Sequence, residues 1–127
     1  MDYLEEYRRK LVPAAEAVKA VKSGDLVHYG EFVMNSGYLD AALAQRVDEL
    51  YGVNIRTTTC PFMPQAVLAD PERKHVIYDD YHMSAASRKL HDRKLCNYIP
   101  LNYHEANSFY DRGYVEADVA LIKVAPM

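Results

Sequence analysis

The sequence contains no tryptophan, only two cysteines and no long hydrophobic run. A membrane-spanning helix needs about 18 consecutive apolar residues, and no stretch of this chain approaches that length. The start of the chain also lacks the basic-then-apolar layout of a secretory signal peptide. Cys60 and Cys96 stand alone in the sequence, as is common in a reducing compartment. These absences favour a cytoplasmic protein with no membrane partner.

Positive charge is also in short supply. The chain has 15 lysines and arginines against 18 aspartates and glutamates, which gives a net charge of −3 and a pI near 5.9. The longest basic run, Arg8–Lys10, follows Glu5 and Glu6 and is typical of the solvated face of a helix. A nucleic-acid binder needs a basic stripe to displace counterions from phosphates, so nucleic acid is not an expected partner.

Short apolar segments alternate with amphipathic ones along the 127 residues, a length that suits one domain. The expected strands cover residues 26–29, 53–58, 75–78, 98–101 and 119–124. The expected helices cover residues 3–11, 13–21, 84–92 and 102–113. A further helix is expected to start after Asn35 or Ser36, either of which can cap it, and its apolar face runs from residue 39 to residue 50. Residues 66–68 fit either kind of element. Because the strands are largely apolar, we predict an α/β fold whose mostly parallel sheet is flanked by helices on both faces.

Ligands of a parallel sheet gather at the carboxyl ends of its strands. The segments that follow the expected strands are residues 30–37, 59–65, 79–84 and 102–105. The stretch from Gly30 to Gly37 could offer backbone N–H groups to an anion, but it has neither the lysine of a phosphate-binding loop nor the three-glycine dinucleotide pattern. On spacing alone, an ordinary turn between strand and helix is the simpler explanation.

Several polar side chains in these segments have a structural explanation as well as a chemical one. His82 and Ser84 fall together at a strand end, where Ser84 can cap the next helix. Asn102 and Glu105 have the spacing of a capping box. Glu31 could act as a nucleophile or base, although a solvated carboxylate is the simpler interpretation.

Histidines and cysteines show no paired spacing of the zinc type, so no metal is expected. The residues concerned are His28, Cys60, His75, His82, His91, Cys96 and His104. A Cys–His nucleophile pair has no support from the spacing either. Cys60 precedes a proline and is expected to be a small buried residue.

Four motifs, taken together and in order, carry a family resemblance. Residues 96–105 (CNYIPLNYHE) and 118–126 (DVALIKVAP) closely resemble the N-terminal half of the acetyl-CoA hydrolase/transferase family. That family includes the butyryl-CoA:acetate and 4-hydroxybutyrate CoA-transferases. Ser23–Asp25 before the first strand and Gly30, and His82–Ser84 followed by Arg88, agree with it. The resemblance spans essentially the whole chain.

The resemblance implies a CoA-transferase fold with two related α/β domains, of which residues 1–127 form the N-terminal one. In this family a glutamate attacks an acyl-CoA thioester, and a glutamyl-CoA thioester forms that a carboxylate substrate resolves. That glutamate lies in the second domain, so no catalytic residue is expected in this chain. Coenzyme A is implied as a substrate, with no covalently bound cofactor. An apolar face for the missing domain would favour self-association, and we expect a homo-oligomer.

By resemblance, the chain supplies one wall of the acyl site of an enzyme that acts on butyryl-, acetyl- or 4-hydroxybutyryl-CoA and a carboxylate such as acetate. The expected substrate-binding residues are Gly30, Gly37, Thr59, Cys60, His82, Ser84, Asn102, His104 and Glu105. Ala85 and Ala86 depart from a region that is usually richer in glycine, and residues 102–104 also differ, so the acyl preference does not carry over. An acyl-CoA hydrolase and a non-catalytic regulatory module that binds a small molecule remain as alternatives.

Overall fold

The computed structural model describes residues 2–125. Its helices are α1 (Tyr3–Lys10), α2 (Ala14–Ala17), α3 (Gly37–Ala44), α4 (Gln65–Leu68), α5 (Ala85–Asp92) and α6 (Ala106–Asp111). Short 3₁₀ turns are η1 (Val18–Ala20), η2 (Phe32–Met34), η3 (Val47–Glu49) and η4 (Tyr103–Glu105). The strands are β1 (Leu26–Glu31), β2 (Val53–Thr58), β3 (Val76–Asp80), β4 (Asn97–Tyr98) and β5 (Val119–Ala120).

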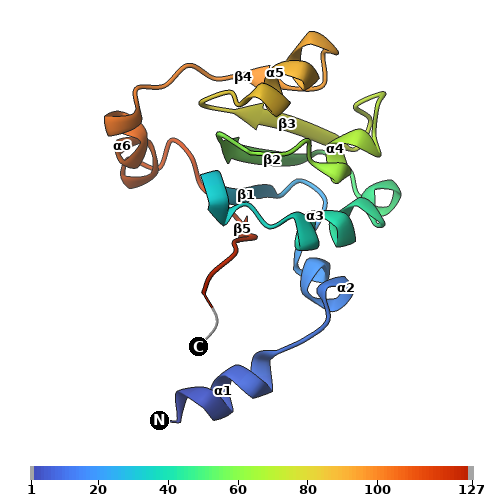
Figure 1. The fold of residues 1–127 in the computed structure, drawn as a ribbon, viewed down its shortest axis with the longest axis vertical. Coiled ribbons are helices and arrows are strands. Elements are labelled where there is room, and N and C mark those ends of the chain that lie inside the picture. Colours follow the sequence, from blue (N-terminus) through green and yellow to red (C-terminus); the bar gives the residue numbers. More distant parts are fainter. Residues whose placement is uncertain (1, 126–127) are drawn as a thin grey trace.

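The five strands form one sheet in the order β4-β3-β2-β1-β5, and every pair is parallel (Figure 1). The predicted α/β fold is therefore confirmed. From β1 the chain adds β2, β3 and β4 in one direction, and then returns through α6 to place β5 on the other side of β1. The strand order thus reverses at β1, and in open α/β sheets such a reversal is where ligands bind.

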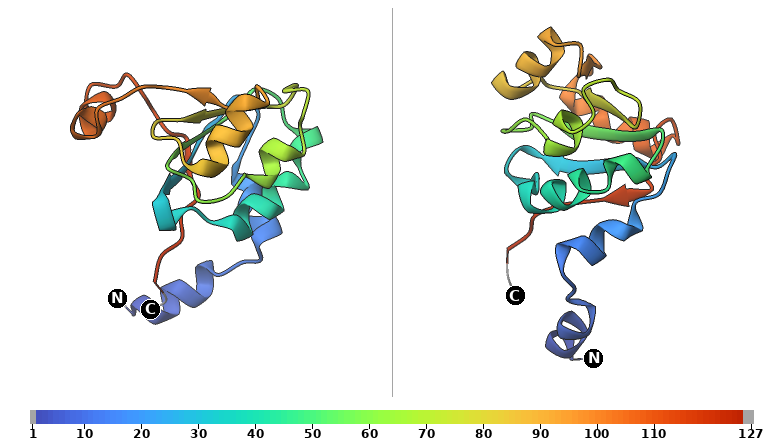
Figure 2. Two further views of the ribbon diagram at one scale, coloured as in Figure 1. Left: turned by 45° about the horizontal axis from the view of Figure 1, so that its top comes forward. Right: turned by 90° about the vertical axis from the view of Figure 1, so that its right-hand side faces the viewer.

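One face of the sheet carries the hydrophobic core. Every second residue of β1 and β2 is buried on this face, including Val27, Tyr29, Val53 and Ile55. Helices α2 to α5 lie on this side of the sheet (Figure 2), and Val18, Leu43, Val67 and Leu90 fill the space between. Alternate side chains of a strand point to opposite faces, so the intervening residues face the other way.

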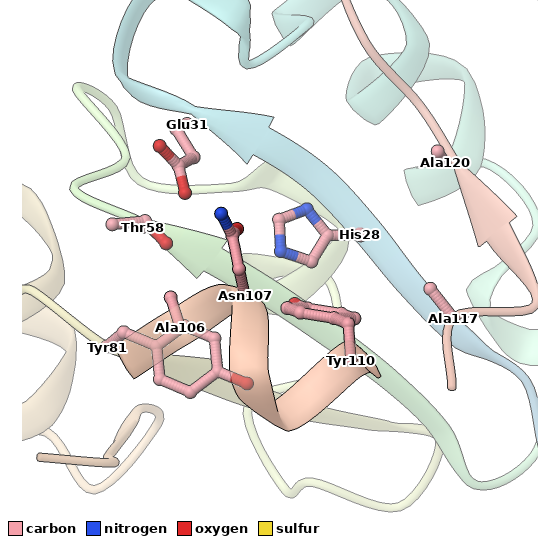
Figure 3. A pocket seen from close by; sticks show the side chains of 9 residues that line it. All are labelled: His28, Glu31, Thr58, Tyr81, Ala106, Asn107, Tyr110, Ala117 and Ala120. Carbon is pink, nitrogen blue, oxygen red and sulfur yellow. The ribbon is translucent and has the colours of Figure 1, made fainter. Parts of the chain in front are cut away.

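The second face is polar, which the sequence analysis did not expect. Asp79 is the centre of a hydrogen-bonded network there, because it accepts from Asn54 Nδ2 at 2.9 Å and from Asn97 Nδ2 at 2.8 Å. Arg56 Nη2 approaches the same carboxylate at 3.4 Å. Helix α6 lies over part of this face, in front of β1 and β2 (Figure 3). Helices therefore lie on both faces as predicted, but the largely apolar character expected of the strands applies only to the face beneath α2 to α5.

The middle helix starts as predicted but ends earlier. It begins at Gly37, and Ser36, one of the two expected caps, accepts the backbone N–H of Leu39 with its Oγ at 3.4 Å. It ends at Ala44, since Arg46 leaves the helical conformation with φ −113° and ψ 2°. The Arg46 guanidinium donates instead to the backbone carbonyls of Val18 and Val21. This tertiary contact, which local periodicity does not reveal, ends the helix.

Two predicted strands are shorter than expected. The strand predicted over residues 98–101 is confined to Asn97–Tyr98, because Pro100 has no N–H to donate and restricts the residue before it. The strand predicted over residues 119–124 ends at Ala120. Beyond it, Ile122 forms an isolated antiparallel bridge with Asn35, and the Lys123 N–H donates to the Met34 carbonyl at 2.7 Å.

Residues 66–68, which fitted either kind of element, lie in α4. Within residues 2–125, none of the helices has the length and hydrophobicity that a membrane span requires.

Candidate functional site

The carboxyl ends of all five strands lie at one edge of the sheet, because the strands are parallel (Figure 1). The segments that follow β1, β2, β3 and β4 therefore come together at this edge, which we call the carboxyl edge. The segment after β4 continues through η4 into α6, and α6 folds back over the polar face of the sheet (Figure 3).

A pocket of about 250 Å³ lies between α6 and the sheet (Figure 3). We call it the α6 pocket, and its lining is His28, Glu31, Thr58, Tyr81, Ala106, Asn107, Tyr110, Ala117 and Ala120. The lining comes from β1, β2, β5, α6 and the residues next to them. Since β2 and β5 flank β1 on opposite sides, the α6 pocket lies where the strand order reverses, the expected place for a ligand in this architecture.

His28 forms one wall of the α6 pocket in its neutral form. Its Nδ1 accepts the backbone N–H of Gly30 at 3.0 Å, which assigns the ring proton to Nε2. Burial lowers the pKa of His28 below 6.5. The ring also packs edge to face against Tyr110, with centroids 6.0 Å apart. His28 therefore offers the pocket an N–H donor without a charge at neutral pH.

Glu31 is the last residue of β1, and it joins the first strand to the segment before α6. The Tyr103 hydroxyl donates to Glu31 Oε2 at 2.6 Å, although the two residues are 72 positions apart. The Tyr103 ring lies 5.7 Å from the ring of His82, and His82 Nε2 is 3.0 Å from the Leu101 carbonyl oxygen. These contacts fasten the residues that precede α6 to the carboxyl edge.

Two residues at the carboxyl edge have the left-handed backbone conformation that side chains disfavour. Phe32 follows β1 with φ 48°, and Thr59 follows β2 with φ 53°. Each such residue stores on the order of 1 kcal/mol of strain, which folds tend to tolerate near functional sites. Thr59 is held by its N–H, which donates to Asp80 Oδ1 at 3.1 Å. Burial raises the pKa of that carboxyl group.

The two glycines among the predicted site residues have different roles. Gly30 has φ 76°, and a Cβ there would lie 3.1 Å from side-chain atoms of Ile122 and Met34. The position therefore requires glycine. At Gly37 a Cβ would meet only Phe62, at an ordinary 3.6 Å.

The contacts of Cys60 and Ser84 indicate structural roles for both residues: Cys60 is buried and Ser84 caps a helix. Cys60 is fully buried, and burial raises the pKa of its thiol to about 12, so it is a poor nucleophile near neutral pH. Ser84 Oγ accepts the N–H groups of Ala86 and Ser87 at 3.0 and 3.1 Å, which confirms the predicted helix cap.

The predicted capping box at Asn102 and Glu105 is wrong. Asn102 Nδ2 donates to Glu105 Oε2 at 2.9 Å, and no cap hydrogen bond from the Asn102 side chain is formed. The reason is that the chain enters α6 through the 3₁₀ turn η4, so the first residues after Asn102 do not have α-helical spacing. Asn102 and Glu105 line a second hollow of about 350 Å³ with Tyr98, Pro100, Leu101 and Phe109. His104, in the same turn, is exposed.

The α6 pocket contains none of the nine residues predicted from the sequence, although it lies beside several of them. Thr58 lines it rather than Thr59, and Tyr81 rather than His82. Ala106 takes the place of Glu105. Glu31, which the sequence analysis weighed as a nucleophile or base, lines the pocket, and so does His28, which it considered only as a metal ligand; both lie in the first strand close to its carboxyl end. Among the described residues, no group of three or more His, Cys, Asp or Glu side chains is placed to hold a metal ion.

Comparison with known proteins shows which family the chain belongs to. The family described as acetyl-CoA hydrolase/transferase N-terminal domain matches residues 1–127. The butyryl-CoA:acetate CoA-transferase of Anaerostipes caccae is 39% identical over 128 residues, which cover 100% of this chain and 28% of that protein. A probable butyrate:acetyl-CoA coenzyme A-transferase of Syntrophomonas wolfei is 39% identical over 124 residues, which cover 98% of this chain and 28% of that protein.

Among solved structures, RipA from Yersinia pestis matches with a TM-score of 0.71 and 25% sequence identity. The match covers 86% of this chain and 28% of the RipA chain. The chain thus spans under a third of the length of the proteins it resembles.

Proposed function

Because the chain belongs to the acetyl-CoA hydrolase/transferase family, we propose that the full-length protein is a CoA-transferase that moves CoA between a short-chain acyl-CoA and a carboxylate such as acetate. Residues 1–127 would be the N-terminal domain, and a second domain would carry the catalytic glutamate. The relatives named for butyryl-CoA and acetate support butyryl- or acetyl-CoA as the donor, and 4-hydroxybutyryl-CoA is a further candidate.

The proposed reaction proceeds through two kinds of covalent intermediate. A glutamate oxygen attacks the thioester carbonyl, and an acyl-glutamyl anhydride forms as CoA thiolate leaves. The thiolate then attacks the glutamyl carbonyl, which gives glutamyl-CoA and releases the first carboxylate. The acceptor carboxylate repeats both steps in reverse, so that the new acyl-CoA leaves and the glutamate is free again.

The contribution of this chain is to bind the acyl end of the substrate in the α6 pocket. The observation that carries this assignment is the position of the pocket, at the carboxyl edge and at the reversal of strand order. Its volume of about 250 Å³ suits a short acyl group rather than the whole CoA molecule. The Nε2–H of His28 and the hydroxyl of Thr58 are available as donors to an acyl oxygen. Neither cysteine is suited to act as a nucleophile near neutral pH, because burial raises the pKa of both thiols to about 12, and we assign the nucleophile to a glutamate of the second domain.

We further propose that the full-length protein is a homo-oligomer in which other parts of the assembly cover α1. This helix extends away from the sheet (Figure 2), and its Tyr3 and Tyr7 side chains are 69% and 43% exposed. Exposed apolar surface of this kind is typical of interfaces.

A hydrolase of the same family is the second candidate, since the description of the matching family names both activities. The test is to incubate the full-length protein with butyryl-CoA in the presence and absence of acetate. A transferase forms acetyl-CoA only when acetate is present. Release of free CoA at the full rate without acetate would establish the hydrolase and contradict the proposed transfer.

A further inference from the structure

The α6 pocket has a carboxylate built into its wall. Glu31 lines the pocket at the end of β1, and its carboxylate lies on the same side of the strand as the His28 ring (Figure 3). The hydrogen bond from the Tyr103 hydroxyl, 2.6 Å long, holds Oε2 in place. The other carboxylate oxygen, Oε1, does not take part in this hydrogen bond. A ligand in the pocket therefore meets a fixed acidic group.

No cation in the lining offsets this carboxylate. Among the described residues that line the pocket there is no lysine or arginine, and His28 accepts a hydrogen bond at Nδ1 as a neutral ring does. Arg56 is nearby but is engaged elsewhere, since Nη1 donates to the Tyr81 hydroxyl at 3.1 Å and Nη2 lies 3.4 Å from Asp79. Its guanidinium also lies over the Tyr81 ring, 5.6 Å from the centroid. Among the lining residues Glu31 therefore carries the one formal charge, and Arg56, which is paired with Asp79, is the nearest cation described.

We propose that Glu31 is a specificity-determining residue, which admits acyl groups with an uncharged end and rejects acyl groups that end in a carboxylate. This inference rests on the proposed function. A butyryl or acetyl chain in the pocket brings no charge near Glu31. A succinyl chain brings a second carboxylate into the same pocket, where the two negative charges repel each other. Discrimination by repulsion of the wrong ligand is a common route to specificity.

The test compares two thioesters in the full-length protein, with acetate as the acceptor. The kcat/KM for butyryl-CoA and for succinyl-CoA is measured for the wild type and for Glu31→Gln, which keeps the size of the side chain and an acceptor for Tyr103. We expect the wild type to prefer butyryl-CoA. We expect Glu31→Gln to shift the ratio toward succinyl-CoA by about tenfold, because the variant removes the repelling charge.

Two further variants separate charge in the pocket from other effects. Glu72→Gln removes the same charge at the opposite edge of the sheet, in the turn before β3, and should leave the ratio and the rates unchanged. Tyr103→Phe removes the hydrogen bond and leaves the charge, so the preference for butyryl-CoA should persist.

An unchanged ratio in Glu31→Gln would overturn the inference, as would a wild type that prefers succinyl-CoA. A shift of the same size in Tyr103→Phe would also overturn it, because the hydrogen bond rather than the charge would then govern the choice. Absence of transfer from both thioesters in the wild type would refute the proposed function and this inference with it.

Discussion

Asp70 fixes the start of β3, and its removal is expected to destabilise the protein strongly. The side chain is 5% exposed, and its carboxylate accepts three backbone N–H groups from the residues that lead into the strand. Oδ1 accepts from Lys74 at 3.0 Å, and Oδ2 accepts from His75 at 2.6 Å and Val76 at 2.8 Å. Because β3 carries Asp79 and leads to Tyr81, this carboxylate helps to position the carboxyl edge from the far end of the strand.

The magnitude follows from those three hydrogen bonds. A hydrogen bond to a charged group contributes about 1.5–3 kcal/mol, and such contributions are not fully additive. Replacement of Asp70 by alanine is therefore expected to cost about 3–5 kcal/mol, and replacement by asparagine, which keeps one acceptor oxygen, about 1–2 kcal/mol. Thermal unfolding of the full-length protein should show the order wild type, Asp70→Asn, Asp70→Ala. Amide hydrogen exchange at residues 74–76 should accelerate in the same order.

The pH dependence provides a second check on Asp70. Burial alone would raise the pKa of this carboxyl group, but the N–H groups of Val76, His75 and Lys74 lower it below 3.8. The unfolded chain therefore takes up the proton first as the pH falls, so the stabilisation is complete above about pH 4 and is lost below it. The difference between the wild type and Asp70→Asn should shrink in that range. An Asp70→Ala protein that melts within about 2 °C of the wild type at pH 7, with unchanged exchange at residues 74–76, would refute the reasoning.

Three other predictions follow from single residues. Gly30→Ala places a Cβ at φ 76° and 3.1 Å from Ile122 and Met34, so urea denaturation should show a loss of about 1–3 kcal/mol; no loss would contradict the close approach. The Cys60 thiol is buried with its pKa raised to about 12, so it should resist iodoacetamide at pH 8 in the folded protein and react after denaturation, as peptide mass spectrometry will show. Burial lowers the pKa of His28, so the unfolded state binds more protons below about pH 6.5 and stability should fall with acidification there. His28→Gln should lessen that fall, and an identical pH profile for the variant would argue against a buried neutral imidazole.

The sequence predicted the parallel α/β sheet because its signals are local. Predicted strands of four to six residues alternate with predicted helices, and Gly24 and Gly52 mark turns before β1 and β2, where the structure gives them φ 88° and 65°. The sequence analysis did not predict the polar second face. Residues 53–56 of β2 (VNIR) alternate between apolar and polar side chains, a pattern that indicates one buried face and one more solvent-exposed face. The sequence analysis gave more weight to the apolar residues of the strands than to the polar residues between them.

The residues predicted from the sequence lie at the same edge of the sheet as the α6 pocket, but none of them lines it. Thr58 and Thr59 are adjacent in sequence, yet only Thr58 lines the α6 pocket, because the path of the chain at the strand end decides which side chain faces α6. The contact between Glu31 and Tyr103 spans 72 residues and depends on the return of the chain from β4 across the sheet. No local pattern encodes such a contact. The family resemblance pointed to the loops at this edge of the sheet, and the α6 pocket becomes visible only in the tertiary structure.

The most direct test of the proposed CoA transfer is to trap the covalent intermediate. The full-length protein is incubated with butyryl-CoA, treated with borohydride, which reduces a glutamyl thioester, and analysed by intact-mass and peptide mass spectrometry. We expect modification of a single glutamate that lies outside residues 1–127, with Glu31 and Glu105 unmodified. Modification of a glutamate within residues 1–127, or an active protein that stays unmodified, would contradict the glutamyl-CoA mechanism and the supporting role assigned to this chain.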